Sequence, residues 1–266
     1  MVKIARITIY PFKSLDGLLL DQAELLPKGS LKQDRQFALT DEHGTIINAK
    51  RTDQIHRLES KFDLEHNQIW IKERKSEKFE KFDLTHDIPN LEKWFSHFFD
   101  QEINLIKNSE QGFPDDTESP GPTIISTGTL ETIASWFGFT DLNEVRNRFR
   151  ANIELNGCAP FWEDQLYADL KQAIQFQMGD MEWLGINPCA RCVVPTRSPL
   201  TGEKLSGFQK TFAEYRKNNL PKDVSLSRWT HFYRLSVNTC PQRYFEGGTL
   251  KIGDEVKILG TESYLK

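Results

Sequence analysis

The stretch with the clearest chemical potential is a pair of cysteines about two-thirds of the way along the chain. Cys189 and Cys192 form a Cys-x-x-Cys spacing, Arg191 stands immediately before the second thiol, and prolines lie on both sides. A cysteine acts as a nucleophile or a metal ligand in its thiolate form, which a neighbouring guanidinium favours. Prolines restrict the flanking backbone and so hold the direction of the sulfur atoms. The segment therefore predicts a presented thiolate.

Three other interpretations of the cysteine pair compete with this one. A thioredoxin-like redox pair opens a helix early in a short βαβ unit, whereas this pair lies late in the chain, before the strand-like Val193 and Val194. A zinc site needs two further ligands at suitable spacing, but the other cysteines, Cys158 and Cys240, are single. Two small cysteines buried in a core are the third alternative, which does not account for the arginine between them.

The cysteine stretch also resembles a specific family. Arg191 and Cys192, followed by two valines, Thr196 and a Pro-Leu-Thr-Gly run over residues 199–202, are similar to the cysteine loop of the MOSC family, the domain related to the C-terminal part of molybdenum cofactor sulfurase. The resemblance implies that Cys192 ligates molybdenum through its sulfur and that Arg191 contacts the cofactor. Cys189 receives no role. A soft thiolate suits a metal already held by the sulfur atoms of a pterin dithiolene.

Two cations near the N-terminus could meet on a phosphate. Lys13 and Ser14 end a Tyr-Pro-x-Lys-Ser segment, and Arg35 lies in an Asp-Arg-x-Phe segment. Lysine offers a point charge and arginine a planar fork for such a group, although solvated surface cations are the simpler interpretation of either one alone. Both segments resemble the N-terminal β-barrel module of longer MOSC proteins. Because the pterin cofactor of the family carries a phosphate, the resemblance assigns Lys13, Ser14 and Arg35 to its anchoring.

A third group of polar residues lies in the second half of the chain. We expect residues 147–155 to form a strand, in which alternation puts Arg148, Arg150 and Asn152 on one face. Such a row beside buried apolar residues is costly unless it faces a ligand or solvent. The segment resembles the Phe-Arg-x-Asn strand of the MOSC family, which implies that these three side chains line the pocket of the anionic cofactor.

Hydroxyl groups stand where a short strand gives way to a helix. Ser126 and Thr127 end the strand, Thr127 or Thr129 is the expected N-cap, and Gly138 lies beyond the helix end. Free N–H groups at a helix N-terminus donate hydrogen bonds to such hydroxyls or bind anions. Capping alone is one interpretation, and the family resemblance favours a contribution of Ser126 and Thr127 to cofactor binding.

A candidate acid follows on a loop. Amidoxime-reducing members of the family usually carry an Asp after a cysteine at the position of Cys158, whereas this chain has Ala159. Glu163 and Asp164 lie a few residues further on. A reaction that consumes protons needs a nearby acid or water. We therefore expect Asp164, or less strongly Glu163, to act as the substitute catalytic acid.

The elements that must position these residues are mostly strands. Alternating or continuous apolar residues predict strands over residues 3–10, 18–26, 33–39, 68–72, 103–106, 174–176, 181–183, 232–237 and 249–259. Helical spacing predicts helices over residues 91–99 and 208–220. Three prolines and several acids in residues 109–122 predict a linker or mobile loop. With the resemblance, we expect a mixed α/β fold dominated by β-strands, in which a smaller β-rich MOSC N-terminal module (1–120) precedes a MOSC β-barrel domain (121–266).

Composition limits the partners and the location. The chain has 266 residues, of which 38% are hydrophobic and 27% charged, as in ordinary soluble globular proteins. Its formal net charge of -4 lacks the basic excess of proteins that bind nucleic acid or membrane surfaces, so we expect neither partner. No apolar run approaches the roughly 20 residues that span a bilayer, and the N-terminal segment has no signal-peptide core. We expect a cytoplasmic location with reduced cysteines.

The resemblance as a whole implies a molybdenum-cofactor-dependent oxidoreductase. Its cofactor is Mo-molybdopterin, and its substrates are N-hydroxylated small molecules such as amidoximes, hydroxylamines and N-hydroxylated bases. The absence of a Gly-x-Gly-x-x-Gly motif after a strand argues against direct use of a nicotinamide. We expect an external electron-transfer protein, because the sequence has neither the length nor the cysteines for a fused iron–sulfur domain. The alternatives are a molybdenum cofactor carrier or a sulfur-transfer protein with a persulfide on Cys192, and a β-barrel interaction module that matches the motifs by chance.

Overall fold

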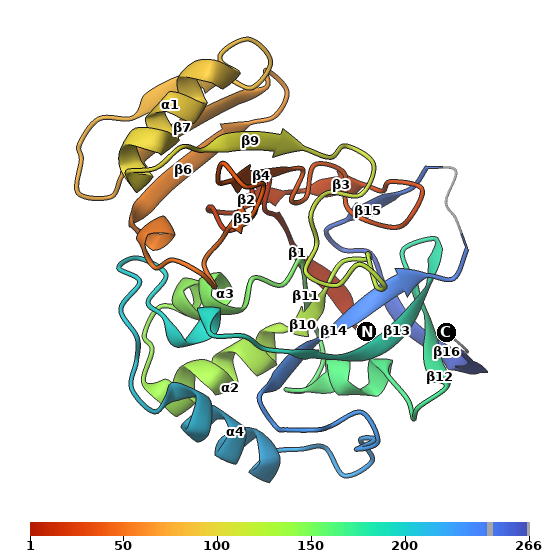
Figure 1. Ribbon diagram of the computed structural model, residues 1–266. Helices are drawn as coiled ribbons and strands as arrows, with labels where there is room; N and C mark the ends of the chain where they lie inside the picture. Colours follow the sequence, from red (N-terminus) through yellow and green to blue (C-terminus); the bar gives the residue numbers. More distant parts are fainter. Residues whose placement is uncertain (244–246, 265–266) are drawn as a thin grey trace.

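The structure is a computed structural model that describes residues 1–243 and 247–264. β-Strands dominate it, as the sequence predicted, and the largest sheet has eight strands in the order β16-β12-β13-β14-β10-β11-β1-β2 (Figure 1). Neighbouring strands are antiparallel except for β10 and β11, which are parallel. The strands are β1 (Lys3–Ile9), β2 (Leu18–Leu20), β10 (Ile124–Ser126), β11 (Ile153–Asn156), β12 (Gln172–Met178), β13 (Met181–Ala190), β14 (Arg234–Pro241) and β16 (Val256–Ser263).

The two ends of this sheet approach each other. Lys3 and Glu255 form a β-bridge, and the N–H of Val256 donates to the Val2 carbonyl at 2.9 Å. The chain just before β16 therefore lies beside the start of β1. The inner face buries a cluster that contains Ile7 and Trp183, both fully buried. The first strand of the chain thus belongs to the sheet of the second half, and the module boundary near residue 120 stays a prediction.

The N-terminal half adds smaller sheets and a second core. Strand β3 (Gln22–Glu24) pairs with β15 (Thr249–Lys251), while the other two sheets have the orders β5-β4-β9 and β6-β7-β8. Their strands are β4 (Phe37–Thr40), β5 (Ile46–Ile47), β6 (Leu58–Asp63), β7 (Gln68–Glu73), β8 (Glu80–Asp83) and β9 (Asn104–Lys107). Helix α1 (Ile88–Phe99) buries Leu91, Phe95 and Phe99 on one face, at the helical spacing that the sequence predicted. Figure 1 shows α1 beside β6 and β7.

The remaining helices lie near the large sheet. They are α2 (Thr127–Phe137), α3 (Leu142–Phe149) and α4 (Phe208–Asn218), with short 3-10 helices η1 (Gln54–Arg57), η2 (Trp162–Leu166) and η3 (Val194–Thr196). Phe149 of α3 and Phe208 and Phe212 of α4 share one hydrophobic cluster. Among the described residues, no helix combines the length and the apolar character needed to cross a membrane.

Two local predictions are wrong. The strand predicted over residues 147–155 begins only at Ile153, because Asp141 caps α3 by accepting from the Asn143 N–H at 2.8 Å and the helix runs on to Phe149. Arg150 then ends the helix in a left-handed conformation with φ 53°. The strand expected to start at Val193 does not form: the 3-10 helix η3 begins at Val194, and its Pro195 has no N–H for a ladder.

Candidate functional site

A cavity of about 540 Å³ gathers residues from both halves of the chain. Among the described residues, eight Lys or Arg side chains and four Asp side chains line it, so its lining carries a positive excess. The cations are Lys13, Arg35, Lys50, Arg74, Arg148, Arg150, Arg191 and Arg234. An enclosed concentration of one sign of charge favours a ligand of the opposite sign. The cavity therefore suits an anion.

Both cysteines of the Cys-x-x-Cys pair line the cavity, but they differ in burial and bonding. Cys189 is buried, its thiol donates to the Asn238 Oδ1 at 2.6 Å, and burial raises the pKa of this thiol to about 11. A thiol held in its protonated form is a poor metal ligand. Cys192 is only half-buried and is free of disulfide bonding. Of the two, Cys192 is the thiol suited to bind a metal in the cavity.

The surroundings of Cys192 bear on the other interpretations of the pair. No group of three or more His, Cys, Asp or Glu side chains in the described part of the chain could hold a metal ion. Zinc, which needs about four protein ligands in a structural site, therefore finds no set of partners there. No α-helix opens at Cys192 either, unlike in a thioredoxin-like motif. A metal that arrives with ligands of its own fits this cavity better.

Arg148 holds the loop after Cys192 in place. Its Nη1 donates to the carbonyls of Pro195 at 2.9 Å and Arg197 at 2.6 Å, and its Nη2 pairs with Glu144 at 2.7 Å. Arg191 donates to the Phe149 carbonyl, at the end of the same helix. The guanidinium of Arg148 borders the cavity but has little hydrogen-bonding capacity left for a ligand. It positions the loop instead.

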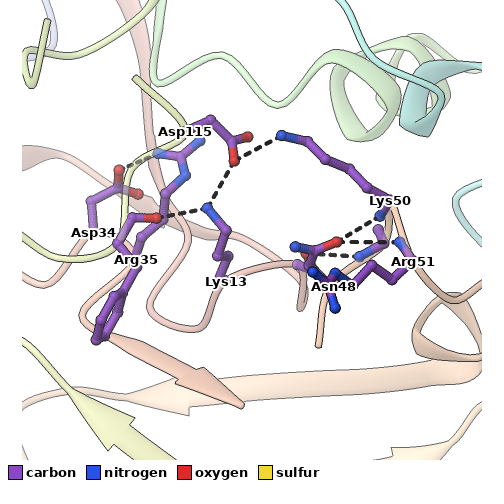
Figure 2. Close-up of polar contacts among 10 residues, drawn as sticks. Lys13, Asp34, Arg35, Asn48, Lys50, Arg51 and Asp115 are labelled. Carbon is purple, nitrogen blue, oxygen red and sulfur yellow. Dashed lines mark hydrogen bonds and ion pairs between the residues drawn. The ribbon is translucent and has the colours of Figure 1, made fainter. Parts of the chain in front are cut away.

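Two lysines of the N-terminal half, Lys13 and Lys50, converge on one carboxylate (Figure 2). The Lys13 Nζ lies 2.8 Å from Asp115 Oδ1, and the Lys50 Nζ lies 3.1 Å from the same oxygen. Arg35 pairs with the adjacent Asp34. The lysines thus hold an internal anion from the segment that the sequence marked as a linker. Partial desolvation at the cavity raises the pKa of Asp115, but Lys13 and Lys50 outweigh it and hold that pKa well below its ordinary value.

Ser14 and Asn152 also line the cavity, with part of their polar capacity used. The Ser14 hydroxyl accepts from the Ala49 N–H at 3.1 Å, and its backbone is left-handed with φ 75°. Asn152 donates to the Thr8 carbonyl at 3.1 Å and accepts from the Thr123 N–H at 3.2 Å. Its amide is therefore a structural link between β1 and the start of β10.

Arg150 differs from the other cavity arginines because its guanidinium makes no hydrogen bond or ion pair with the described residues. Its guanidinium lies over the Tyr10 ring at 3.9 Å, and its Nη2 is buried with no hydrogen-bond partner. Within residues 1–243 and 247–264, no carboxylate pairs with it. A buried donor without an acceptor costs about 1–3 kcal/mol, which an anionic ligand would offset. This orphaned donor, together with Cys192, fits a cofactor that carries both a metal and negative charge.

Three predicted residues lie outside the cavity. Ser126 caps α2 by accepting from the Thr129 N–H at 3.2 Å, and the Thr127 hydroxyl donates to Glu154 at 2.8 Å. Asp164 is buried and pairs with Arg216 Nη2 at 2.5 Å. None of the three lines the cavity. The expected cofactor contacts of Ser126 and Thr127 and the expected acid role of Asp164 are therefore corrected: capping, a bond to the buried Glu154 and a core ion pair occupy these groups.

Several lining residues were missed by the sequence analysis. They are His56, Asp34, Arg74, Asp115, Asn238 and Arg234. Asp34 stood inside a quoted motif, and Asp115 stood in the acidic stretch taken as a linker. The other four carry no local signal, because η1, β7 and β14 reach the cavity only through tertiary packing. The Nε2 of His56 is buried without a hydrogen-bond partner, as is the Nε of Arg234.

Comparisons with known proteins agree with this picture. Residues 1–98 match the family model of the MOSC N-terminal beta barrel domain. Molybdenum cofactor sulfurase of Caenorhabditis elegans is 22% identical over 228 residues, which cover 78% of this chain and 30% of the relative. Mitochondrial amidoxime-reducing component 1 of Homo sapiens is 24% identical over 307 residues, which cover 97% of this chain and 83% of the relative.

The chain spans about a third of the length of the sulfurases that it matches. For example, it is 22% identical to the molybdenum cofactor sulfurase of Solanum lycopersicum and covers 31% of that protein. Among solved structures, the YUAD protein from Bacillus subtilis covers 100% of this chain and 98% of its own. Its identity of 13% and TM-score of 0.41 are too low to support a conclusion.

Proposed function

Since this chain is a MOSC domain protein, similar to molybdenum cofactor sulfurases and to an amidoxime-reducing component, we propose that it is a molybdenum-cofactor-dependent reductase of N-hydroxylated compounds. One observation carries the proposal: a cation-lined cavity holds a half-buried thiol, Cys192, and the guanidinium of Arg150, whose buried Nη2 has no hydrogen-bond partner. The substrates are amidoximes, hydroxylamines or N-hydroxylated bases. An external electron-transfer protein is the proposed partner.

The side chains at the cavity divide the work. Cys192 binds the metal through its sulfur, while Lys13, Arg35 and Arg150 bind the negative charges of the pterin and its phosphate. Arg148 orients the loop that carries the thiol. When bound, the cofactor supplies a metal that stores two electrons. The net reaction breaks the N–O bond of the substrate, consumes two electrons and two protons, and releases the oxygen as water.

Water is the proposed source of the protons. All four carboxylates that line the cavity already bond to other groups of the chain, so none is a free acid. Their partners are Arg74 for Asp16, Arg35 for Asp34, Lys13 for Asp115 and Asn238 for Asp116. Protons must therefore enter from solvent through the cavity mouth.

The test compares the two cysteines. Wild type, Cys192→Ala and Cys189→Ala are produced in a host that makes Mo-molybdopterin, and molybdenum per chain and benzamidoxime reduction with an artificial electron donor are measured. We expect bound molybdenum and turnover in wild type, and a loss of both by more than about tenfold in Cys192→Ala. Cys189→Ala should keep its molybdenum. Full molybdenum content and activity in Cys192→Ala would reject the ligand role.

A second candidate is a cofactor carrier or sulfur-transfer protein with a persulfide on Cys192. The observation that favours it is the match to sulfurases over about a third of their length. Molybdenum that passes readily to a cofactor-free acceptor enzyme, without benzamidoxime turnover, would support the carrier. An extra sulfur atom on Cys192 in the mass spectrum, absent after treatment with a thiol reductant, would support sulfur transfer.

A further inference from the structure

His56 is a cavity residue that the proposed function does not yet use. It lies on the short helix η1, its ring borders the cavity, and its Nε2 is fully buried with no hydrogen-bond partner. A buried polar atom in this state costs about as much as a lost hydrogen bond. Native structures seldom leave such an atom unless a ligand or water completes it. The ring is therefore placed to meet a bound molecule.

Helix η1 is fixed against the loop that carries Cys192. The Arg197 Nη1 lies 3.3 Å from Asp53 Oδ2, immediately before η1. Val194, two residues after Cys192, packs against the hydrophobic cluster that contains Ile55. On the other side, the Arg74 Nε donates to the His56 carbonyl at 3.0 Å. Helix η1 is thus held from both sides, and its His56 lines the same cavity as the candidate metal ligand Cys192.

The charge around the ring determines what it can recognise. Burial and the nearby Arg150, Arg197 and Arg74 together lower the pKa of His56 to about 4, against the opposing effect of Asp53. The ring is therefore neutral near pH 7 and offers one N–H donor and one acceptor nitrogen. The guanidiniums around it repel a cationic group. A neutral polar group is the partner that fits.

Apolar side chains complete this part of the cavity. Leu15, Ile55 and Leu58 line it, and all three are at most 3% exposed. They belong to one hydrophobic cluster, in which Ile55 and Leu58 flank His56 in sequence. A wall of this kind stabilises an aromatic or alkyl group by removing its surface from water.

We propose that His56 is a substrate-binding residue whose imidazole hydrogen-bonds the N-hydroxylated head of an uncharged substrate while Leu15, Ile55 and Leu58 contact its apolar body. This rests on the proposed function and narrows its substrate class. Uncharged aryl or alkyl amidoximes are favoured, and permanently cationic N-hydroxylated compounds are disfavoured. The covalent step and its electron and proton balance are unchanged.

The experiment uses molybdenum-loaded protein in four forms: wild type, His56→Ala, His56→Gln and His43→Ala. Gln keeps a neutral donor and acceptor, and His43 is an exposed control, with its side chain 80% exposed. Molybdenum content, the Kd of benzamidoxime by calorimetry without electron donor, and kcat and KM are measured. We expect His56→Ala to raise Kd and KM about tenfold, with kcat within about threefold and molybdenum unchanged. His56→Gln should recover most of the affinity.

Each result decides the proposal. An unchanged Kd in His56→Ala overturns it, and so does a failure of His56→Gln to recover binding. A loss of molybdenum in His56→Ala means that the imidazole holds the cofactor instead of the substrate. If wild type has neither molybdenum nor turnover, the proposed function itself is refuted. This outcome is distinct from a failure of the His56 proposal, because wild type is measured before the variants.

A pair of isosteric probes tests the charge preference in wild type. Benzamidoxime with a para tert-butyl group is neutral, and its para trimethylammonium counterpart has nearly the same shape with one positive charge. We expect the neutral compound to bind at least about tenfold more tightly, because the guanidiniums near His56 repel the cation. Equal affinities would contradict the proposed substrate class.

Discussion

Arg216 and Arg150 are both enclosed arginines, but their surroundings differ. Arg216 is 0% exposed, and its Nη2 lies 2.5 Å from Asp164, so the chain supplies the opposite charge. Arg150 borders the cavity, and no carboxylate in the described part of the chain pairs with it. Burying a charge is costly unless a partner compensates it. In the core, Asp164 compensates the charge of Arg216, whereas at the cavity the charge of Arg150 is left for a ligand to compensate.

The same contrast separates the acids of the two regions. Asp164 and its neighbour Glu163 are both buried in the core beside Arg216. Asp115, at the cavity, is exposed and bridges Lys13 and Lys50. In the core, Asp164 stabilises the fold through its ion pair, whereas the unpaired carboxyl of Glu163 destabilises it when ionised. At the cavity, Asp115 competes with any anionic ligand for Lys13 and Lys50. The predictions below test this division, from the largest expected effect to the smallest.

The core ion pair gives the largest effect. Arg216→Met leaves the Asp164 carboxylate buried without its partner, so we expect the free energy of unfolding to fall by about 3–5 kcal/mol. Urea denaturation measures it. The double variant Arg216→Met/Asp164→Leu should recover much of the loss, since it removes the unpaired charge. A loss below about 1 kcal/mol in the single variant would break the comparison, because the core pair would then be no different from a surface pair.

Glu163 gives a pH-dependent effect in the same core. Burial and the neighbouring Asp164 raise its pKa from 4.5 to about 7. The folded state therefore holds a proton that the unfolded state releases, and stability falls as pH rises from about 4.5 to 7. Glu163→Gln removes this loss, and we expect it to be more stable than wild type by up to about 3 kcal/mol at pH 8, with little difference at pH 4.

Denaturant titrations of wild type and Glu163→Gln at several pH values check this sign. The control is Glu131→Gln on the exposed side of α2, which should leave the pH dependence unchanged. If Glu163→Gln keeps the wild-type slope between pH 5 and 7, the buried carboxyl does not set it.

Asp115 gives the smallest effect. Its side chain is 60% exposed, so solvent screens its pairs with Lys13 and Lys50, and Asp115→Asn should destabilise the cofactor-free protein by less than about 1 kcal/mol at pH 7. Because these lysines hold its pKa well below the ordinary 3.8, the difference should shrink progressively as pH falls from about 3.8 towards that lower pKa.

Loss of this internal anion should also free the two lysines for a ligand. We expect Asp115→Asn to retain molybdenum cofactor a few-fold longer than wild type during dialysis. Shorter retention in the variant would show that the carboxylate supports the site and does not compete with its ligand.

The cysteine motif and the family resemblance singled out Cys192, Lys13 and Arg35, and all three line the cavity. Arg148 and Arg150 also reach it, but through a different local structure: the predicted strand is the end of α3, where Arg150 turns left-handed. The pattern of charged and apolar residues in this segment was compatible with a strand and with the end of a helix.

Contacts between residues far apart in the sequence determine the rest of the site and of the fold, and local sequence does not predict them. Asp164 finds Arg216 across 52 residues of chain, which removes it from the candidate site. His56 reaches the cavity because η1 packs beside the cysteine loop through Val194 and Arg197. The predicted strand over residues 3–10 formed as β1, but its place in the large sheet depends on pairing with β11, far along the chain. None of these contacts has a signature in local sequence.

The most direct test of the central claim compares two arginines at the end of α3. Arg150 faces the cavity without an internal anion, and Arg146 pairs with Glu154 at 2.7 Å outside it. In protein from a host that makes Mo-molybdopterin, we predict that molybdenum per folded chain falls at least about tenfold in Arg150→Met and stays at the wild-type level in Arg146→Met. Equal molybdenum in wild type and Arg150→Met would contradict the claim that the orphaned guanidinium marks the cofactor site.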